Sequence, residues 1–387
     1  MGKIKSLIMT QIIKHTGIGR PDPKVWIFSS TDNSHYNYNS RYLFEYVKDN
    51  LKDITPYFVI NDNELRKKME EKYGSQYFME TISPAGIRKA LKAGVWFTSA
   101  GLPVYGLNLG KNRTIVNLWH GIPLKKIALL DPNLKKAARL YFRKLFTENY
   151  TFILTCSRYL IPIMAESFAI SPSAIKVWGQ PRNDMFFVEN NRTEILKKIY
   201  GELPEYRKVI LYAPTFRDYG VTRLFPFPDY DKEKLDEFLE KEKILLCIRT
   251  HISEQGNAGQ YLSARIRFLG NEQKEDIAEI LNIFDLLITD YSSIYIDYLI
   301  LERPEIFLPY DREIYMKDRG MNFTYDDVTP GAKPETMEEF MQVIAETFAG
   351  NDEYVEKRSR CNEFFNEIKE PCMQHICDEV KEYVGIE

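Results

Sequence analysis

The sequence predicts an α/β fold built from two successive doubly wound parallel domains. Short runs rich in β-branched and aromatic residues recur along the chain, and stretches with helical periodicity separate them. This alternation stops once, at a polar and turn-rich segment, and then begins again. The length of 387 residues also suits two domains better than one hydrophobic core.

Six strands are predicted before the interruption and five after it. The first group comprises Val25–Phe28, Pro56–Ile60, Val95–Thr98, Thr114–Leu118, Phe152–Thr155 and Ile175–Val177. The second comprises Val209–Tyr212, Ile244–Ile248, Ile266–Phe268, Leu286–Thr289 and Ile306–Leu308. Strands that alternate with helices form a parallel sheet covered on both faces.

The interruption itself, Gly201–Pro204, marks the predicted domain boundary. We therefore expect an amphipathic N-terminal segment over 1–20 and two Rossmann-like domains over 21–204 and 205–345. Residues 346–387 are charged with helical periodicity, and we expect them to form helices that pack back across the domains. Ligands of such domains bind at the carboxyl ends of the strands.

Composition excludes several classes of protein. A net charge of −3 argues against a nucleic-acid partner, because neutralising phosphates requires a basic surface. The odd set of five scattered cysteines is no disulfide framework and favours a reducing cytoplasm. No run reaches the roughly 18 apolar residues that cross a bilayer, so we expect neither export nor a membrane span.

Two histidines follow predicted strands, one in each domain. His120 follows the strand ending at Leu118 and precedes a Gly-Pro turn, while His251 follows the strand ending at Ile248. An imidazole with a pKa near 6.5 can accept a proton from an attacking hydroxyl at neutral pH. Each histidine taken alone could equally be a packed core residue; their matching positions favour a shared site.

Anion-binding groups follow other strands. Asp290, Ser292 and Ser293 lie where a strand meets a helix, so the serines could cap the helix, bind a phosphate, or do both. Arginines stand at three comparable places with their polar neighbours, although single surface arginines are usually solvated. The candidate cleft residues are Arg182, Asn183, Thr215, Arg217 and Arg249.

Five ordered motifs resemble the CDP-glycerol glycerophosphotransferases of teichoic-acid synthesis. They are Leu118-Trp-His-Gly121, Tyr212-Ala-Pro-Thr-Phe-Arg217, Arg249-Thr-His251, Thr289-Asp-Tyr-Ser-Ser293 and Glu302-Arg-Pro304, and the resemblance covers roughly residues 95–335. In that family proline usually follows the second histidine, whereas Ile252 stands here. We expect the imidazole to be retained and the turn to differ.

The resemblance implies a glycosyltransferase-B fold with an acceptor domain followed by a donor domain. It implies that His120 is the base, that His251 lies beside the donor diphosphate, and that Ser292 and Ser293 hold phosphate. The acceptor hydroxyl would attack the β-phosphorus of CDP-glycerol and release CMP. Such a transfer depends on alignment and charge stabilisation, so a metal is optional and we expect no cofactor.

Two further clusters have simpler interpretations. Asp229 and Asp231 form the single Asp-x-Asp match, and helix capping explains them better than metal binding. Cys372, His375 and Cys377 have metal-like spacing but lie in a predicted tail helix without a fourth ligand nearby. We interpret that cluster as structural.

Two amphipathic segments could hold the enzyme at the cytoplasmic face of an anionic membrane as a peripheral protein. Apolar residues recur at helical spacing over Lys3–Lys14. The stronger signal is Lys125–Lys144, which interleaves apolar residues with Lys125, Lys126, Lys135, Lys136, Arg139, Arg143 and Lys144. Ordinary surface helices with a solvated basic face are the alternative.

Several functions share these features. The near-bare catalytic unit favours a primase that adds the first glycerol phosphate to a polyprenyl-diphosphate-linked disaccharide. A glycerol-phosphate polymerase, a CDP-ribitol-using relative and a nucleotide-sugar glycosyltransferase remain alternatives, as does a membrane-binding scaffold that would not need the two histidines. The acceptor sugar, the residues that contact cytidine and any homo-oligomer are open.

Overall fold

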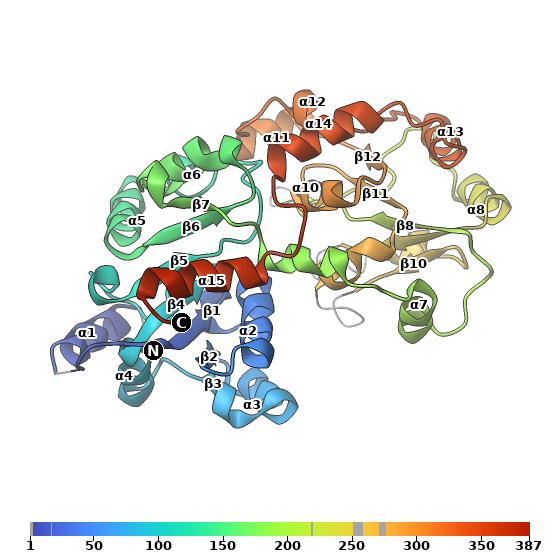
Figure 1. Cartoon of the computed structure of the whole chain (residues 1–387). Helices are drawn as coiled ribbons and strands as arrows, with labels where there is room; N and C mark the ends of the chain where they lie inside the picture. Colours follow the sequence, from blue (N-terminus) through green and yellow to red (C-terminus); the bar gives the residue numbers. More distant parts are fainter. Residues whose placement is uncertain (1–2, 17, 218–219, 251–257, 271–275) are drawn as a thin grey trace. The chain divides into compact units, whose positions relative to one another are not determined.

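The computed structural model describes residues 3–16, 18–217, 220–250, 258–270 and 276–387. The chain divides into two compact units, shown in Figure 1. Unit 1 contains Met1–Asp184 and Glu367–Glu387, and unit 2 contains Met185–Asn366.

Unit 1 is built on a seven-stranded sheet in the order β3-β2-β1-β4-β5-β6-β7, with every neighbouring pair parallel. The strands are β1 (Asp22–Ser29), β2 (Thr55–Val59), β3 (Phe78–Met79), β4 (Ala93–Thr98), β5 (Thr114–Asn117), β6 (Phe152–Thr155) and β7 (Ile175–Val177). The strand order reverses between β1 and β4, which is the switch point of a Rossmann-like sheet.

The helices of unit 1 cover this sheet. They are α1 (Lys3–Lys14), α2 (Tyr38–Asn50), α3 (Asn63–Tyr73), α4 (Pro84–Lys92), α5 (Lys136–Asn149), α6 (Ile161–Phe168) and α15 (Met373–Val384). Helix α2 packs on β1 and β2, and α4 packs on β1 and β4. Between the helices, β4 is buried along its whole length, as a strand covered on both faces must be.

Unit 2 repeats the plan with a five-stranded parallel sheet in the order β10-β9-β8-β11-β12. Its strands are β8 (Lys208–Tyr212), β9 (Ile244–Ile248), β10 (Ile266–Phe268), β11 (Leu286–Thr289) and β12 (Glu305–Phe307). Its helices are α7 (Arg192–Tyr200), α8 (Lys232–Lys241), α10 (Ile294–Tyr298), α11 (Arg312–Arg319), α12 (Tyr325–Val328), α13 (Met337–Phe348) and α14 (Val355–Phe365). Leu235 of α8 and Phe340 of α13 share one buried cluster with inward residues of all five strands.

All eleven predicted strands are present, with bounds shifted by at most a few residues at some ends. The twelfth strand, β3, is only two residues long and carries too little pattern to be predicted. The parallel, Rossmann-like α/β prediction is therefore confirmed by the sheet topology.

The division between the units differs from the expected boundary at 204/205. The chain passes into unit 2 after Asp184, because residues ahead of β8 already bind there: Arg192 forms a two-bond ion pair with Asp285, at 2.9 Å for each bond. Asn190 in turn bonds Asn282 at 2.7 Å. A turn-rich segment at 201–204 is thus a loop within unit 2.

The C-terminal segment is also divided. Helix α14 belongs to unit 2, whereas the chain from Glu367 returns to unit 1, where α15 packs beside α2 (Figure 1). Asp184 accepts hydrogen bonds from the backbone N–H groups of Cys372 and Met373, at 2.8 and 3.0 Å, and so caps α15. Arg158 holds the returning chain through a bidentate pair with Glu367.

Candidate active site

His120 lies in the loop after β5, next to the switch point of the unit 1 sheet. Its Nδ1 is 2.8 Å from the backbone oxygen of Ser99, which follows β4. A carbonyl oxygen can only accept, so this Nδ1 carries the hydrogen. The neutral imidazole therefore presents an unprotonated Nε2, which is the form that a general base requires.

Two aromatic rings enclose this imidazole. Tyr38, the first residue of α2, stacks on it with centroids 4.9 Å apart and an interplanar angle of 22°. The Trp119 ring lies on it at 4.1 Å and 35°. Burial lowers the pKa of His120, the nearby charge of Arg182 lowers it further, and the bond to Ser99 opposes both. The result favours the neutral base at physiological pH.

Of the neighbouring candidate cleft residues Arg182 and Asn183, Arg182 contacts the loop that carries this histidine. Arg182 donates from Nη1 to the backbone oxygen of His120 at 2.8 Å. Asn183 is buried, and its Oδ1 has no hydrogen-bond partner among the described residues. The guanidinium thus fixes the loop that carries the imidazole.

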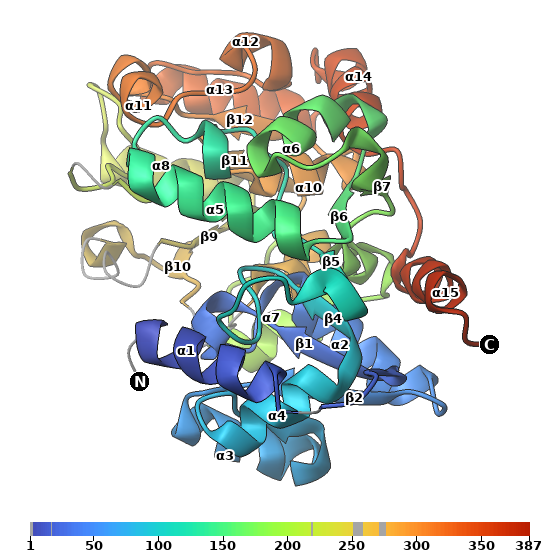
Figure 2. The same cartoon turned by 90° about the vertical axis from the view of Figure 1, so that its left-hand side faces the viewer.

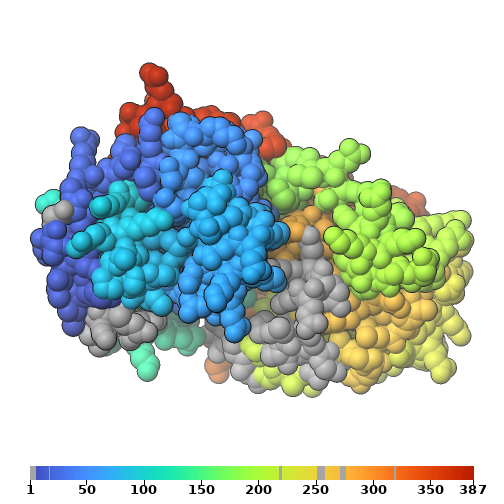
Figure 3. All heavy atoms as spheres, turned by 90° about the horizontal axis from the view of Figure 1, so that it is seen from below, coloured from blue at the N-terminus to red at the C-terminus, as the bar shows by residue number. Residues whose placement is uncertain are grey.

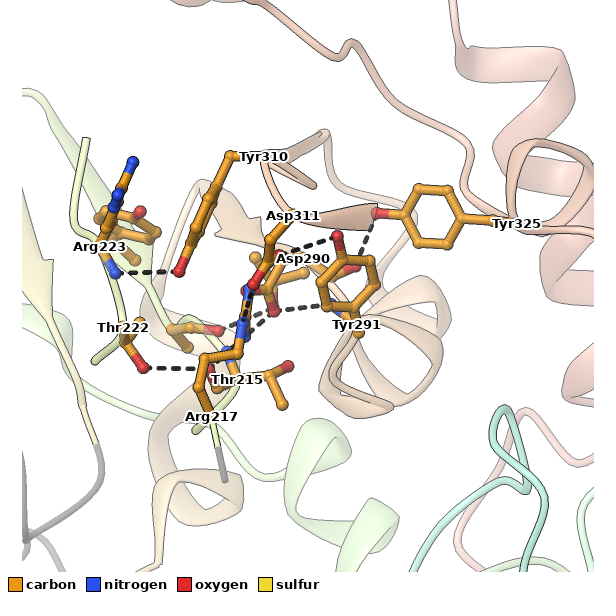
Figure 4. A network of polar contacts seen from close by, with 12 residues as sticks. Thr215, Arg217, Thr222, Arg223, Asp290, Tyr291, Tyr310, Asp311 and Tyr325 are labelled. Atoms are coloured by element: carbon orange, nitrogen blue, oxygen red, sulfur yellow. Dashed lines mark hydrogen bonds and ion pairs between the residues drawn. The ribbon is translucent and has the colours of Figure 1, made fainter. Parts of the chain in front are cut away.

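Arg217 also follows a strand, β8 in unit 2, but its surroundings differ from those of His120 (Figure 4). Its side chain is 1% exposed and pairs with both Asp290 and Asp311, at 2.7 Å each. Nη1 also donates to the Thr215 oxygen. Burial alone would lower the pKa of Arg217, but Asp311 and Asp290 outweigh it and raise the pKa.

This network changes the expected role of three candidates. Asp290 accepts from the backbone N–H groups of Thr215 and Tyr291, at 2.8 and 2.6 Å, while Arg217 occupies its other oxygen. Arg217 and Asp290 therefore hold the loops after β8 and β11 together, and their charges are paired within this network. Thr215 is tied by its backbone and leaves a buried Oγ1 without a partner among the described residues.

The other donor candidates are more open. Ser292 and Ser293 are half-buried at the start of α10, where the Ser292 hydroxyl accepts from Ile294 N at 3.4 Å. Arg249 follows β9, and burial lowers its pKa while Asp276 raises it. His251 lies outside the described residues.

The candidate membrane residues divide into two groups. Lys126, Lys135, Lys136, Arg143 and Lys144 are exposed, and Leu140 and Tyr141 stand among them with 72% and 40% of their surfaces accessible. Arg139 is instead bound to the backbone oxygens of Leu129 and Asp131, and Lys125 is half-buried. In α1, Ile8 and Ile12 are 53% and 61% exposed.

The two simpler interpretations fit the structure. Asp231 caps α8 by accepting from Glu233 N at 3.0 Å, and Asp229 accepts from Met337 N at 2.7 Å at the start of α13. Cys372 and Cys377 are buried, and His375 meets the edge of Trp178 at 6.2 Å.

The sequence motifs do not include the partners that complete both sites. Tyr38 and Asn39 in unit 1, and Asp311 in unit 2, contact the predicted residues from elements distant in the chain. The polar stretch that follows β1, over residues 29–40, was the available signal for the first pair, because the turn after the first strand lies at the switch point.

A family model for CDP-Glycerol:Poly(glycerophosphate) glycerophosphotransferase matches residues 12–379. The chain belongs to the CDP-glycerol glycerophosphotransferase family. The chain is 31% identical to the teichoic acid poly(glycerol phosphate) polymerase of Bacillus subtilis (strain 168), over 83% of the chain and 43% of that protein. It is 27% identical to the teichoic acid glycerol-phosphate transferase of Staphylococcus aureus, over 93% of both chains.

The fold agrees with that relationship. A solved structure of the wall teichoic acid polymerase TagF superposes with a TM-score of 0.79 at 25% identity, over 97% of this chain and 93% of that one. The chain spans 43% of the B. subtilis polymerase but 90% of the corresponding Bacillus spizizenii polymerase. Length therefore does not separate primase from polymerase among these relatives.

Proposed function

We propose that this glycerophosphotransferase transfers glycerol phosphate from CDP-glycerol to a hydroxyl of a polyprenyl-diphosphate-linked disaccharide and releases CMP, as a teichoic acid primase. The observation that carries the proposal is His120, whose Nδ1 is committed to Ser99 while Nε2 is left to accept a proton. Similarity to the glycerol-phosphate transferase and to the B. subtilis glycerol-phosphate primase, at 33% identity over 58% of both chains, supports it.

In this mechanism His120 Nε2 takes the proton of the acceptor hydroxyl as its oxygen attacks the β-phosphorus. The new P–O bond completes a phosphodiester, and the bond to the bridging oxygen breaks so that CMP leaves with the electron pair. Such a reaction needs alignment and cations near the non-bridging oxygens. Arg249, Ser292, Ser293 and His251 are the proposed donor-binding set, with Arg217 and Asp290 positioning their loops.

The proposal includes the glycosyltransferase-B fold, with the acceptor taken by unit 1 and the donor by unit 2. Two Rossmann-like sheets that follow one another in the chain support it, since each presents strand carboxyl ends for ligand. The similarity to TagF supports it as well.

One assay tests the reaction and separates the alternatives. The purified protein is incubated with a defined lipid-linked disaccharide and, in parallel, CDP-glycerol, CDP-ribitol or a nucleotide sugar. Mass spectrometry then counts the units added. One added glycerol phosphate supports the primase; a ladder of products identifies a polymerase, which the polymerase relatives favour as the second candidate. Transfer of a sugar or of ribitol phosphate alone would overturn the donor assignment.

The proposed reaction takes place at the cytoplasmic face of the membrane. Among the described residues, no helix is long and apolar enough to cross a bilayer. Helices α1 and α5 both lie on the side of unit 1 that faces the viewer in Figure 2, and the N-terminal part of the chain, in dark blue, lies at the edge of unit 1 in Figure 3. Their exposed apolar side chains, with the exposed basic residues of α5, support peripheral binding to anionic lipid.

We expect replacement of Lys135, Lys136, Arg143 and Lys144 by Gln to weaken binding to anionic vesicles. Basic residues near such a surface contribute about 1 kcal/mol each and are screened by salt over roughly 10 Å at 0.1 M. Vesicle co-sedimentation at two salt concentrations measures the effect, and transfer to a short-chain soluble acceptor controls for the active site. Arg139→Gln serves as the contrast, because that side chain holds a loop; unchanged vesicle binding by the fourfold variant would shift the assignment to α1.

A further inference from the structure

The first turn of α2 contributes three consecutive residues to the surroundings of His120, which lies 80 positions later in the chain. The Tyr38 ring lies on the imidazole at 4.9 Å. Asn39 Nδ2 donates to the backbone oxygens of Leu118 and Trp119, at 3.1 and 3.0 Å. The Ser40 hydroxyl donates to the Ser29 oxygen and accepts from the Ser99 hydroxyl, both at 2.8 Å, and the backbone oxygen of Ser99 holds Nδ1 of the histidine.

Asn39 connects the two loops of the site. It is fully buried, and its Oδ1 accepts from Arg182 N at 3.2 Å while its amide reaches the residues before His120. Arg182 in turn donates to the His120 oxygen. A single amide thus uses its donor and acceptor sides to fix the loop after β5 against the loop after β7. An aspartate of the same shape could replace only the acceptor side.

The backbone here is held in an unfavourable conformation. Tyr38 and Trp119 have φ values of 58° and 53°, in the left-handed region that bulky residues rarely adopt. Such conformations persist where surrounding contacts enforce them, and they concentrate at functional sites. The Asn39 bond to the Trp119 oxygen and the stacked Tyr38 ring are contacts of that kind.

We propose that Tyr38, Asn39 and Ser40 are positioning residues that fix the orientation and tautomer of the His120 imidazole. Asn39 holds the backbone on which the ring is carried. Ser40 holds Ser99 through the Ser99 hydroxyl, and the backbone carbonyl of Ser99 selects the Nδ1–H tautomer. Tyr38 covers one face of the ring and keeps water from it, while Arg182 is the charged group that faces the same imidazole.

The spectroscopic test does not depend on the proposed function. Protein labelled with ¹⁵N-histidine contains five imidazoles, each with two ring nitrogens. The ring-nitrogen signals that are lost in His120→Ala are assigned to His120. We expect its wild-type signal to show the Nδ1–H tautomer and a pKa below 6.5. In Tyr38→Gly, which removes the ring and tolerates the left-handed backbone, the pKa should rise because water reaches the imidazole. Tyr38→Phe, which keeps the ring, should leave it in place.

The second arm concerns Asn39 and rests on the proposed transfer reaction. We expect Asn39→Ala and Asn39→Asp to lower kcat about a hundredfold with little change in the donor KM, because small displacements of a catalytic group have effects of that size. Asn50→Ala is the matched control, since Asn50 bonds the Tyr46 oxygen at 2.9 Å from the far end of the same helix. Ser40→Ala should give a mixture of tautomers.

The outcomes separate the two proposals. Loss of the tautomer and pKa signatures in these variants, with no transfer from CDP-glycerol by the wild type, would support positioning and reject the proposed function. An unchanged His120 signal in Tyr38→Gly and Ser40→Ala would overturn the positioning role, whatever the activity. Recovery of full kcat in Asn39→Asp would show that the amide donors are unnecessary and would reject the part assigned to Asn39.

Discussion

His120 in unit 1 and Arg217 in unit 2 follow comparable strands, yet their environments are opposite. His120 is enclosed by two aromatic rings, its Nδ1 is bonded to the Ser99 carbonyl, and one charged side chain, Arg182, lies near it. Arg217 is buried between two carboxylates. The unit 1 site holds an imidazole whose neutral form is favoured, and the unit 2 site uses its charges to join two loops.

The difference shows that position after a strand predicts where a residue lies but not what it does. A cation at a strand end can face a ligand or be neutralised by a neighbour that the local sequence does not reveal. Asp311, which decides the matter for Arg217, comes 94 residues later. The two sites can therefore be distinguished by what each substitution damages.

Removing His120 should give the largest effect and should spare the fold. We expect His120→Ala to reduce transfer by about 10²–10⁴-fold, the usual contribution of a general base, while CDP-glycerol affinity stays within a few-fold. A CMP-release assay and calorimetry with CDP-glycerol measure the two quantities. Substantial turnover by this variant would remove His120 from the catalytic role and with it the contrast between the sites.

Removing Arg217 should lower the stability of unit 2 more than it lowers affinity for the donor. Arg217→Ala leaves two buried carboxylates without their partner, which typically costs about 3–5 kcal/mol. The four tryptophans, Trp26, Trp96, Trp119 and Trp178, all lie in unit 1, so their fluorescence reports that unit alone. We expect far-UV circular dichroism to show an earlier unfolding transition while the tryptophan transition is unchanged.

The double variant Asp290→Asn, Asp311→Asn tests the same network from its acidic side. Partial rescue of Arg217→Ala by these neutral amides would confirm that unpaired charge causes the loss. Normal stability of Arg217→Ala combined with lost donor affinity would return Arg217 to the donor site and contradict the role assigned from its burial.

Replacing Arg182 should have a smaller and more selective effect, because its charge shifts the pKa of His120 and is not part of the buried ion-pair network of unit 2. Its field lowers the pKa of His120, so Arg182→Gln should raise that pKa. The acidic limb of the kcat/KM profile should then move to higher pH, with a few-fold loss of rate near pH 6 and little loss at pH 8. A uniform loss across the profile would contradict the effect of its charge and would indicate that the bond to the His120 oxygen, or a substrate contact, is what matters.

The sequence predicted the strands well because buried parallel strands are continuous apolar runs, as in Ile244–Ile248. It placed His120 at a strand end, and the structure gives that residue the tautomer of a base. It could not reveal Tyr38, Asn39 or Asp311, whose roles depend on contacts between distant elements. Arg217 shows the same limit, since its charge suggested a ligand while its burial shows a partner.

The smallest expected effect is a difference in how the two units respond to pH. Burial lowers the pKa of His120 in the folded state. Between that lowered pKa and 6.5 the unfolded chain binds more protons than the folded one, so unit 1 loses stability as pH falls through this window.

Glu305 in β12 makes unit 2 respond to pH in the opposite direction. It is buried, both carboxyl oxygens lack a hydrogen-bond partner among the described residues, and burial raises its pKa well above 4.5, although Arg358 opposes this.

Below pH 4.5 Glu305 is protonated in both states, and its contribution to stability is present in full. As pH rises from 4.5 toward the folded-state pKa, the unfolded chain releases the proton first, so unit 2 loses up to about 1.4 kcal/mol per pH unit. Glu305→Gln removes this titration, and its stability relative to wild type should grow between pH 5 and pH 8. Circular dichroism in denaturant measures that difference, while tryptophan fluorescence follows unit 1 in the same samples. A difference independent of pH would mean that Glu305 is ionised and paired with Arg358, and the buried charges of unit 2 would then all be compensated as those around Arg217 are.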